Sequence, residues 1–249
     1  MKNLTFAEHF CELKNRTLYV LSFFLCAFIC SYYFADKIYA FLLSPLANYY
    51  ASQGKHGSII YTGLTEAFFT YLRLSFISAV FFTVPIFTMN FFAFIAPALK
   101  KEEKKIAVTI LIAMPILFLL GAFIAYYFVF PSAWPYFLSF ENSSLGDLSI
   151  KSETRISEYL TLSTQIILAF GITFQLPIAI ALLNKFSLIS IKTLRSQRRL
   201  AIVIIFIVAA VITPPDIFSQ VVLAGIMILL YEFSILLCIF FNKKRDQKC

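Results

Sequence analysis

The sequence predicts an all-α integral membrane protein, and two observations lead to this class. The chain is 60% hydrophobic with a mean hydropathy of +0.84, whereas soluble domains are about 45–50% apolar. Runs such as 106–130 carry no charge and are long enough to cross a hydrocarbon core of about 30 Å. The whole chain, 1–249, is therefore predicted to form a single membrane domain.

Six transmembrane helices are expected from the apolar runs. Their approximate bounds are 17–35, 67–92, 106–130, 157–184, 200–213 and 217–241. The fifth run has only about 13 residues, although a span usually needs about 20, so it requires bilayer thinning or support from neighbouring helices. The longest connecting segments, about 36–66 and 131–156, are predicted to be loops.

The distribution of basic residues predicts the orientation of these spans. Of the 21 lysines and arginines, 16 lie in the N-terminal segment, the loops after the second and fourth spans, and the C-terminal segment. Only Lys37, Lys55, Lys151 and Arg155 lie on the other side, with Arg73 inside the second span. Because basic residues in short loops stay on the cytoplasmic side, both termini are predicted to be cytoplasmic.

Prolines and a possible helix cap predict breaks between and within the spans. Pro85, Pro115 and Pro177 fall inside apolar runs and are expected to kink their helices. Such kinks either shape an ordinary bundle or build a concave, cup-like wall. At the start of the sixth span, Thr213 is the expected N-cap and Asp216 the expected N3 residue of a capping box.

Several polar side chains lie at membrane depth, where they usually face the bundle interior. Gln175 can bond to a partner helix without a charge change. Glu232 either stays protonated and hydrogen-bonded or pairs with another helix. Arg73 either pairs with Glu66 or extends to the outer interface.

The loop after the second span is short and highly charged, with four lysines and two glutamates at 100–105. The lysines explain its cytoplasmic side, but glutamates contribute little to orientation. Glu102 and Glu103 therefore form a candidate site for a cationic ligand. The alternative interpretation is that they are solvated residues that balance the neighbouring lysines.

Motifs of nucleotide binding, serine hydrolysis and zinc peptidases do not occur, and the two histidines, His9 and His56, are on opposite predicted sides. The five cysteines form no Cys-x-x-Cys pair, and Cys26 and Cys30 are expected to pack as small apolar residues. An enzyme is therefore not expected, and no metal or other cofactor is predicted.

Short motifs in a fixed order along nearly the whole chain resemble the TatC family, the polytopic core subunit of the twin-arginine protein translocase. They are HFCELKNR at 9–16, SPL at 44–46, EAFF at 66–69, AFIAPAL at 93–99 with Glu103, FVFP at 128–131, AFGITFQLP at 169–177 and TPPDIFSQ at 213–220. The resemblance implies six spans in a cup, cytoplasmic termini and a place in the bacterial-type inner membrane. It also implies binding of twin-arginine signal peptides and export of folded proteins with the proton-motive force. The implied partners are the single-span subunits TatA and TatB, together with further copies of this chain in a larger complex.

The resemblance assigns signal-peptide recognition to Glu12 and Glu103, because two guanidinium groups need two separate carboxylates. The companion residues of this expected site are Lys14, Arg16, Phe94 and Glu102, and the expected partner or intramembrane polar residues are Gln175, Glu232, Asp216 and Glu66.

The chain departs from the family pattern at three positions. Lys14 stands where many members have arginine, Asn15 replaces a basic residue, and Gln175 replaces a glutamate. A mechanism that needs ionisation at position 175 is therefore not expected here. The alternative function is a small-molecule secondary transporter, which would be indicated by internal symmetry and a charged site at the midplane.

Overall fold

The computed structural model describes residues 6–54, 59–60, 63, 65–95, 101–139, 154–186, 188–213 and 216–246. The chain divides into two compact units. The first comprises residues 1–116 and 153–164, and the second comprises 117–152 and 165–249. Each unit is considered by itself below.

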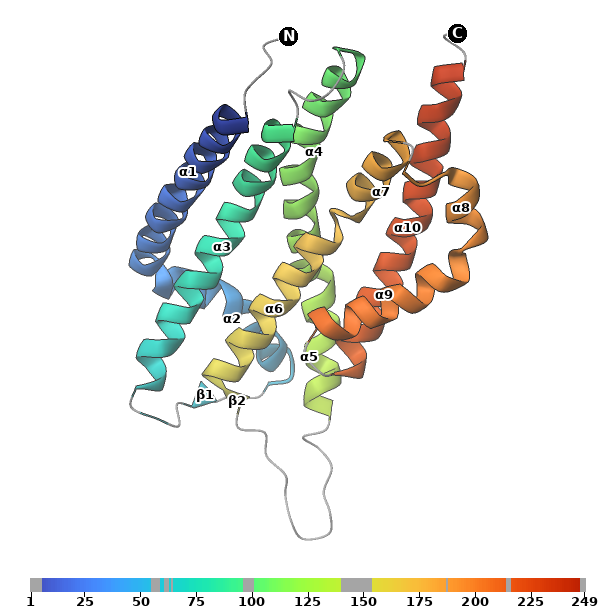
Figure 1. Ribbon diagram of the computed structural model, residues 1–249. Coiled ribbons are helices and arrows are strands. Elements are labelled where there is room, and N and C mark those ends of the chain that lie inside the picture. Colours follow the sequence, from blue (N-terminus) through green and yellow to red (C-terminus); the bar gives the residue numbers. More distant parts are fainter. Residues whose placement is uncertain are drawn as a thin grey trace. The chain divides into compact units, whose positions relative to one another are not determined.

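The first unit is built around the pair α1 and α3. Its elements are α1 (Phe6–Tyr33), α2 (Ala35–Ser52), β1 (Ile59–Ile60), α3 (Glu66–Ile95), the start of α4 (Lys101–Ile124), β2 (Thr154–Arg155) and the start of α6 (Ile156–Thr173). Helices α1 and α3 run antiparallel side by side (Figure 1). The two-residue strands pair in parallel, with Ile59 opposite Thr154. This pairing brings the segments before α3 and α6 together.

The second unit is organised around its last helix. Its elements are the rest of α4, the π-helical turn η2 (Ala125–Val129), α5 (Phe130–Leu138), the rest of α6, α7 (Leu176–Lys185), α8 (Ile191–Ser196), α9 (Arg198–Ile212) and α10 (Ile217–Asp246). Helix α10 packs against α7, α8 and α9. The Tyr231 hydroxyl donates to the Leu194 carbonyl at 2.9 Å, which joins α10 to α8.

Five helical segments of the described chain are long and apolar enough to cross a membrane. They are Cys11–Tyr33, Glu66–Phe91, Thr109–Leu138, Ile156–Lys185 and Ile217–Phe240. The predicted class, an all-α membrane protein, is confirmed, apart from the short β1–β2 pair. The predicted fifth span appears as α9, whose 15 residues make it shorter than these segments, so its crossing of the membrane stays a prediction.

The predicted loop at 36–66 is wrong over its first half, which forms the 18-residue helix α2. Ala35, Leu42 and Leu46 are buried, and their spacing puts one apolar stripe on one helix face. Pro45 has no N–H to donate to the Phe41 carbonyl, four residues before Pro45. The Ser44 hydroxyl donates to this carbonyl instead, at 3.0 Å. This periodicity was present in the sequence and identifies the helix.

The prolines inside the apolar runs differ in their effect on helix continuity. Pro85 lies inside α3 and Pro115 inside α4, and both helices continue through them, so the kinks expected there stay predictions. The predicted loop at 131–156 is wrong over its first residues, because α4, η2 and α5 follow one another without a gap as far as Leu138. Pro177 does mark a break, since α6 ends at Thr173 and α7 begins at Leu176.

The expected capping box before α10 is also wrong. The Thr213 hydroxyl donates to the Ala209 carbonyl at 2.8 Å, so Thr213 closes α9 instead of opening α10. Asp216 is the residue that caps α10, because its Oδ2 accepts the Ser219 backbone N–H at 2.6 Å.

Two glycines allow α4 and α6 to approach closely within the second unit. A Cβ atom at Gly121 would stand 2.5 Å from the Phe170 carbonyl oxygen. A Cβ atom at Gly171 would stand 2.7 Å from a ring carbon of Phe118. Phe118 and Phe170 are both fully buried, so neither ring can move into open space.

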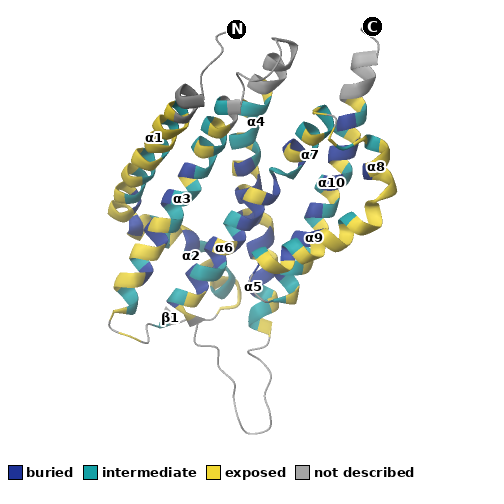
Figure 2. Cartoon of the chain, viewed as in Figure 1, coloured by how far each residue is buried: buried dark blue, intermediate teal, exposed yellow. Residues whose placement is uncertain are grey.

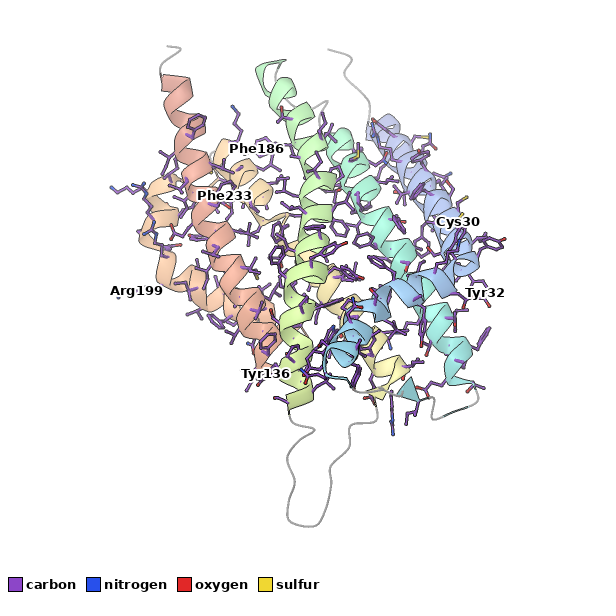
Figure 3. The ribbon with its side chains drawn as sticks, turned by 180° about the vertical axis from the view of Figure 1, so that it is seen from behind. Cys30, Tyr32, Tyr136, Phe186, Arg199 and Phe233 are labelled. Atoms are coloured by element: carbon purple, nitrogen blue, oxygen red, sulfur yellow. The ribbon has the colours of Figure 1, made fainter. Side chains whose placement is uncertain are left out.

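Burial separates core helices from peripheral ones. Figure 2 shows mostly exposed or intermediate residues along α1, whereas α6 is rich in buried ones. Cys30 and Tyr32 are exposed near the end of α1, and Arg199 is exposed in the first turn of α9 (Figure 3). Cys26 is exposed too, so the predicted packing of Cys26 and Cys30 inside the protein is wrong.

Candidate functional site

The predicted recognition residue Glu12 lies on α1, one turn before Arg16, and the two form an ion pair. Arg16 donates to the same oxygen, Glu12 Oε1, from Nη2 at 2.8 Å and from Nε at 3.0 Å. Both side chains are about 30% exposed. A charge pair at this spacing on a helix surface is weakly stabilising, by about 0.2–0.5 kcal/mol.

Arg16 also connects α1 to α3. Its Nη1 donates to the Asn90 backbone carbonyl at 3.4 Å. The Asn90 side-chain amide donates to the Ile86 carbonyl at 3.0 Å, so it is held along its own helix. One guanidinium therefore contacts a carboxylate of the first helix and the backbone of the third.

An open hollow of about 670 Å³ surrounds this pair. It is lined by Cys11, Glu12, Asn15, Arg16, Tyr19 and Asn90. A carboxylate, two amides and a phenol provide acceptors for a cationic group, and the aromatic ring adds an apolar wall. The hollow therefore suits a peptide that carries guanidinium groups beside apolar residues.

The other predicted recognition residues lie at the same end of the first unit. Figure 1 shows the beginning of α1, the end of α3 and the beginning of α4 there. Lys14 is exposed on α1, and Phe94 is partly buried near the end of α3. Glu102 and Glu103 fall in the first turn of α4. Their side chains lie outside the described residues, so the distance from Glu103 to Glu12 stays a prediction.

The predicted intramembrane residue Glu232 is paired within the chain. Its Oε2 accepts from Arg198 Nη2 at 2.9 Å, which joins α10 to the start of α9. The side chains are 43% and 49% exposed respectively. The expected interhelical partner is thus an arginine of the same chain, 34 positions away.

Gln175 and Glu66 occupy structural junctions. Gln175 lies between α6 and α7, where its backbone N–H donates to the Ile172 carbonyl at 3.0 Å. Glu66 begins α3 and accepts the Ser157 hydroxyl at 2.6 Å and the Gly63 N–H at 3.1 Å. No ion pair of Arg73 is found among the described residues, so of its two expected roles the extension to the outer interface stays a prediction.

Sequence reasoning missed Asn90 and Tyr19 as parts of the hollow. Asn90 is a polar residue near the end of an apolar run, and this position is a signal that could have identified it. Its relation to Arg16 could not be predicted, because 74 positions separate them. Among the described residues, no group of three or more histidine, cysteine or acidic side chains is placed to hold a metal ion.

The helices and this hollow define a multi-pass α-helical membrane protein with a carboxylate-bearing polar site near the beginning of α1. A sequence model of the Sec-independent protein translocase protein (TatC) family matches residues 8–225. The chain therefore belongs to the TatC family, whose members are components of a protein translocase.

Individual relatives agree over almost the whole chain. The TatC protein of Rickettsia prowazekii is 48% identical over 98% of this chain and 96% of its own length. That of Escherichia coli strain K12 is 33% identical over 95% and 88%. A crystal structure of the twin arginine translocase receptor TatC is 31% identical, covers 92% of this chain and 99% of its own, and has a TM-score of 0.78.

Proposed function

We propose that this protein is the receptor subunit of a twin-arginine translocase and binds twin-arginine signal peptides at its cytoplasmic face. The observation that carries the proposal is the open hollow, in which the Glu12 carboxylate already accepts two N–H groups from one guanidinium. Similar solved structures are of a twin arginine translocase receptor, and the family membership supports the same role.

The Glu12–Arg16 pair supports a chemical basis for the proposed recognition. A signal-peptide guanidinium makes the same charge-assisted bonds to Glu12 that Arg16 makes within the chain. An exposed ion pair contributes only about 0–1 kcal/mol, so exchanging one guanidinium for the other costs little. Glu103 is proposed to receive the second arginine, with Glu102 as its neighbour. Lys14 and Phe94 flank the bound peptide.

The orientation follows from charge. The hollow is proposed to lie on the cytoplasmic side, where signal peptides arrive, because lysines cluster at 100–105 and basic residues are frequent in both terminal segments. The proposed membrane is the bacterial inner membrane. Both termini are proposed to be cytoplasmic for the same reason.

The partners are proposed to be TatA and TatB, whose single helices contact polar groups of this chain at membrane depth. Gln175 lies between α6 and α7 and Asp216 between α9 and α10, and a polar side chain of a partner helix is proposed to bond at these junctions. Transport of folded proteins is proposed to use the proton-motive force.

Site-specific photocrosslinking tests the receptor role. A photoreactive residue replaces Tyr19 in the hollow, and a second version replaces Tyr33 at the far end of α1 as the control. A twin-arginine signal peptide should crosslink strongly at position 19 and weakly at position 33. A matched twin-lysine peptide should crosslink less at position 19, because lysine cannot make the bidentate bonds of a guanidinium. Equal crosslinking of both peptides at position 19 would contradict the proposal.

A further inference from the structure

A second cavity lies within the first unit, between α3 and α6, and has a volume of about 130 Å³. Its polar lining consists of Glu66, Thr70, Arg73, Ser157, Thr161 and Thr164. It is far from the hollow at Glu12, because Glu66 and Asn90 are 24 positions apart on α3, roughly 36 Å by helical rise. The cavity therefore needs an explanation separate from signal-peptide binding.

The depth of the cavity is set by the length of the span. The apolar segment Glu66–Phe91 has 26 residues, which gives about 39 Å of helix against a hydrocarbon core of about 30 Å. This excess length, together with the charged Glu66 at the start of the segment, favours a position of the first turn of α3 in the headgroup layer. The beginning of α6 is at the same level, because Ser157 bonds Glu66 and β1 pairs with β2 just before both helices.

The acidic group of the cavity is held in place by neutral donors. Glu66 Oε1 accepts the Ser157 hydroxyl at 2.6 Å, and Oε2 accepts the Gly63 N–H at 3.1 Å. A carboxylate offers about four acceptor sites, so Glu66 can bond several N–H groups at once. Thr161 and Thr164 donate their hydroxyls to the Ser157 and Leu160 carbonyls, which leaves the lone pairs of these hydroxyls able to accept further N–H groups.

The basic group of the cavity is Arg73, two turns further along α3. It is exposed, and the ion pairs found among the described residues do not include it. Phe69 and Phe76 share its helix face and are 62% and 51% exposed. A guanidinium among exposed aromatic side chains on a membrane span reaches toward the headgroup layer, and it binds phosphate oxygens in a bidentate manner.

We propose that this cavity binds the headgroup of an aminophospholipid, the phosphatidylethanolamine class. The phosphate lies at Arg73, and the primary ammonium donates to Glu66 and to the threonine hydroxyls. The two charged residues are seven positions apart, about 10.5 Å along the helix, so a zwitterionic headgroup fits between their side chains. The exposed Phe69 and Phe76 face the acyl chains.

The headgroup chemistry separates this lipid from its competitors. A choline headgroup carries the same charges but has no N–H to donate to Glu66. A glycerol headgroup has the phosphate but no cation, so it cannot form an ion pair with the Glu66 carboxylate. Binding should therefore depend on the ammonium protons and not only on the phosphate.

The test measures lipid retention by the purified full-length protein with native mass spectrometry. The protein is exchanged separately with phosphatidylethanolamine, phosphatidylcholine and phosphatidylglycerol of identical acyl chains. The wild-type chain should retain several-fold more phosphatidylethanolamine than either of the others. Equal retention of phosphatidylethanolamine and phosphatidylcholine, or of phosphatidylethanolamine and phosphatidylglycerol, would overturn the proposal, and this comparison needs no variant.

Variants then locate the two contacts. Arg73→Gln should lower the retention of all three lipids, whereas Glu66→Gln should remove the preference for phosphatidylethanolamine and leave the phosphate contact. Arg155→Gln is the matched control, because Arg155 is exposed near the same helix ends but pairs with Glu158 at 3.5 Å and does not line the cavity. Retention of phosphatidylethanolamine at the wild-type level by Arg73→Gln would also overturn the assignment.

Discussion

Arg16 bonds a single oxygen of Glu12 through two of its nitrogens, at 2.8 and 3.0 Å, inside the open hollow between α1 and α3. The carboxylate that we propose binds a signal-peptide arginine is thus already bonded to an arginine of the protein itself. This arrangement orients the carboxylate, while the exposure of both side chains keeps the pair easy to exchange.

The first prediction concerns the charge of Glu12. Glu12→Ala should weaken binding of a twin-arginine signal peptide, because one guanidinium loses its carboxylate, and Glu12→Lys should weaken it further through repulsion. A loss of several-fold to roughly tenfold is expected for alanine, which corresponds to about 1–1.5 kcal/mol. Crosslinking of the peptide in membranes at equal protein levels measures the effect. Glu158→Ala is the control, since Glu158 is an exposed carboxylate at the start of α6. Undiminished crosslinking with Glu12→Lys would exclude Glu12 from the site.

The second prediction concerns the crossing of α4 and α6. Gly121→Ala and Gly171→Ala should each destabilise the protein by about 1–3 kcal/mol, because the added methyl group meets the Phe170 carbonyl or the Phe118 ring. Thermal unfolding of the detergent-purified protein measures this. Gly225→Ala on α10 is the matched control, because a Cβ there meets nothing within 4 Å. If all three variants unfolded at the same temperature, the close approach of α4 and α6 would be disproved.

The third prediction concerns the topology. In a cysteine-free background, Lys101→Cys should react with a membrane-impermeant thiol reagent only after the cells are opened, because the lysine-rich loop is expected to be cytoplasmic. Lys37→Cys lies on the opposite side and should react from outside intact cells. The reverse pattern would invert the topology and remove the hollow from the side where signal peptides arrive.

The fourth prediction concerns Gln175 at the junction of α6 and α7. Gln175→Leu should reduce export of a folded substrate partially, since a hydrogen bond within a membrane averages only about 0.6 kcal/mol. Gln175→Glu should be tolerated if its carboxyl stays protonated. Export assays combined with crosslinking of TatA and TatB to position 175 measure both effects. Full export by Gln175→Leu with unchanged crosslinking would show that the side chain serves only in packing.

The fifth prediction concerns the Arg198–Glu232 pair, which joins α9 to α10 at 2.9 Å. Because both side chains are nearly half exposed, Arg198→Ala or Glu232→Ala should cost only about 0.2–1 kcal/mol. The charge-swapped double variant, Arg198→Glu with Glu232→Arg, should recover part of that loss. A double-mutant cycle on thermal unfolding measures the coupling, and strictly additive losses would show that the pair contributes nothing.

The sequence by itself determined the class of the protein and the position of most spans. Hydropathy and helix length are local properties, and 106–130 or 217–241 could be assigned from residues that are neighbours in the chain. The order of the short motifs also predicted the family, which the family model confirms. Helix α2 was within reach of the same reasoning, because Ala35, Leu42 and Leu46 follow a helical period.

Only the tertiary structure decided which polar groups meet. Arg16 reaches Asn90 across 74 positions, Glu66 accepts from Ser157 across 91, and Glu232 meets Arg198 across 34. The sequence offered Arg73 as one possible partner for Glu66, because the two residues are two turns apart on one helix. The physical reason is that such contacts depend on how helices pack, and packing at points such as Gly121 and Phe170 is specified by residues far apart in the chain.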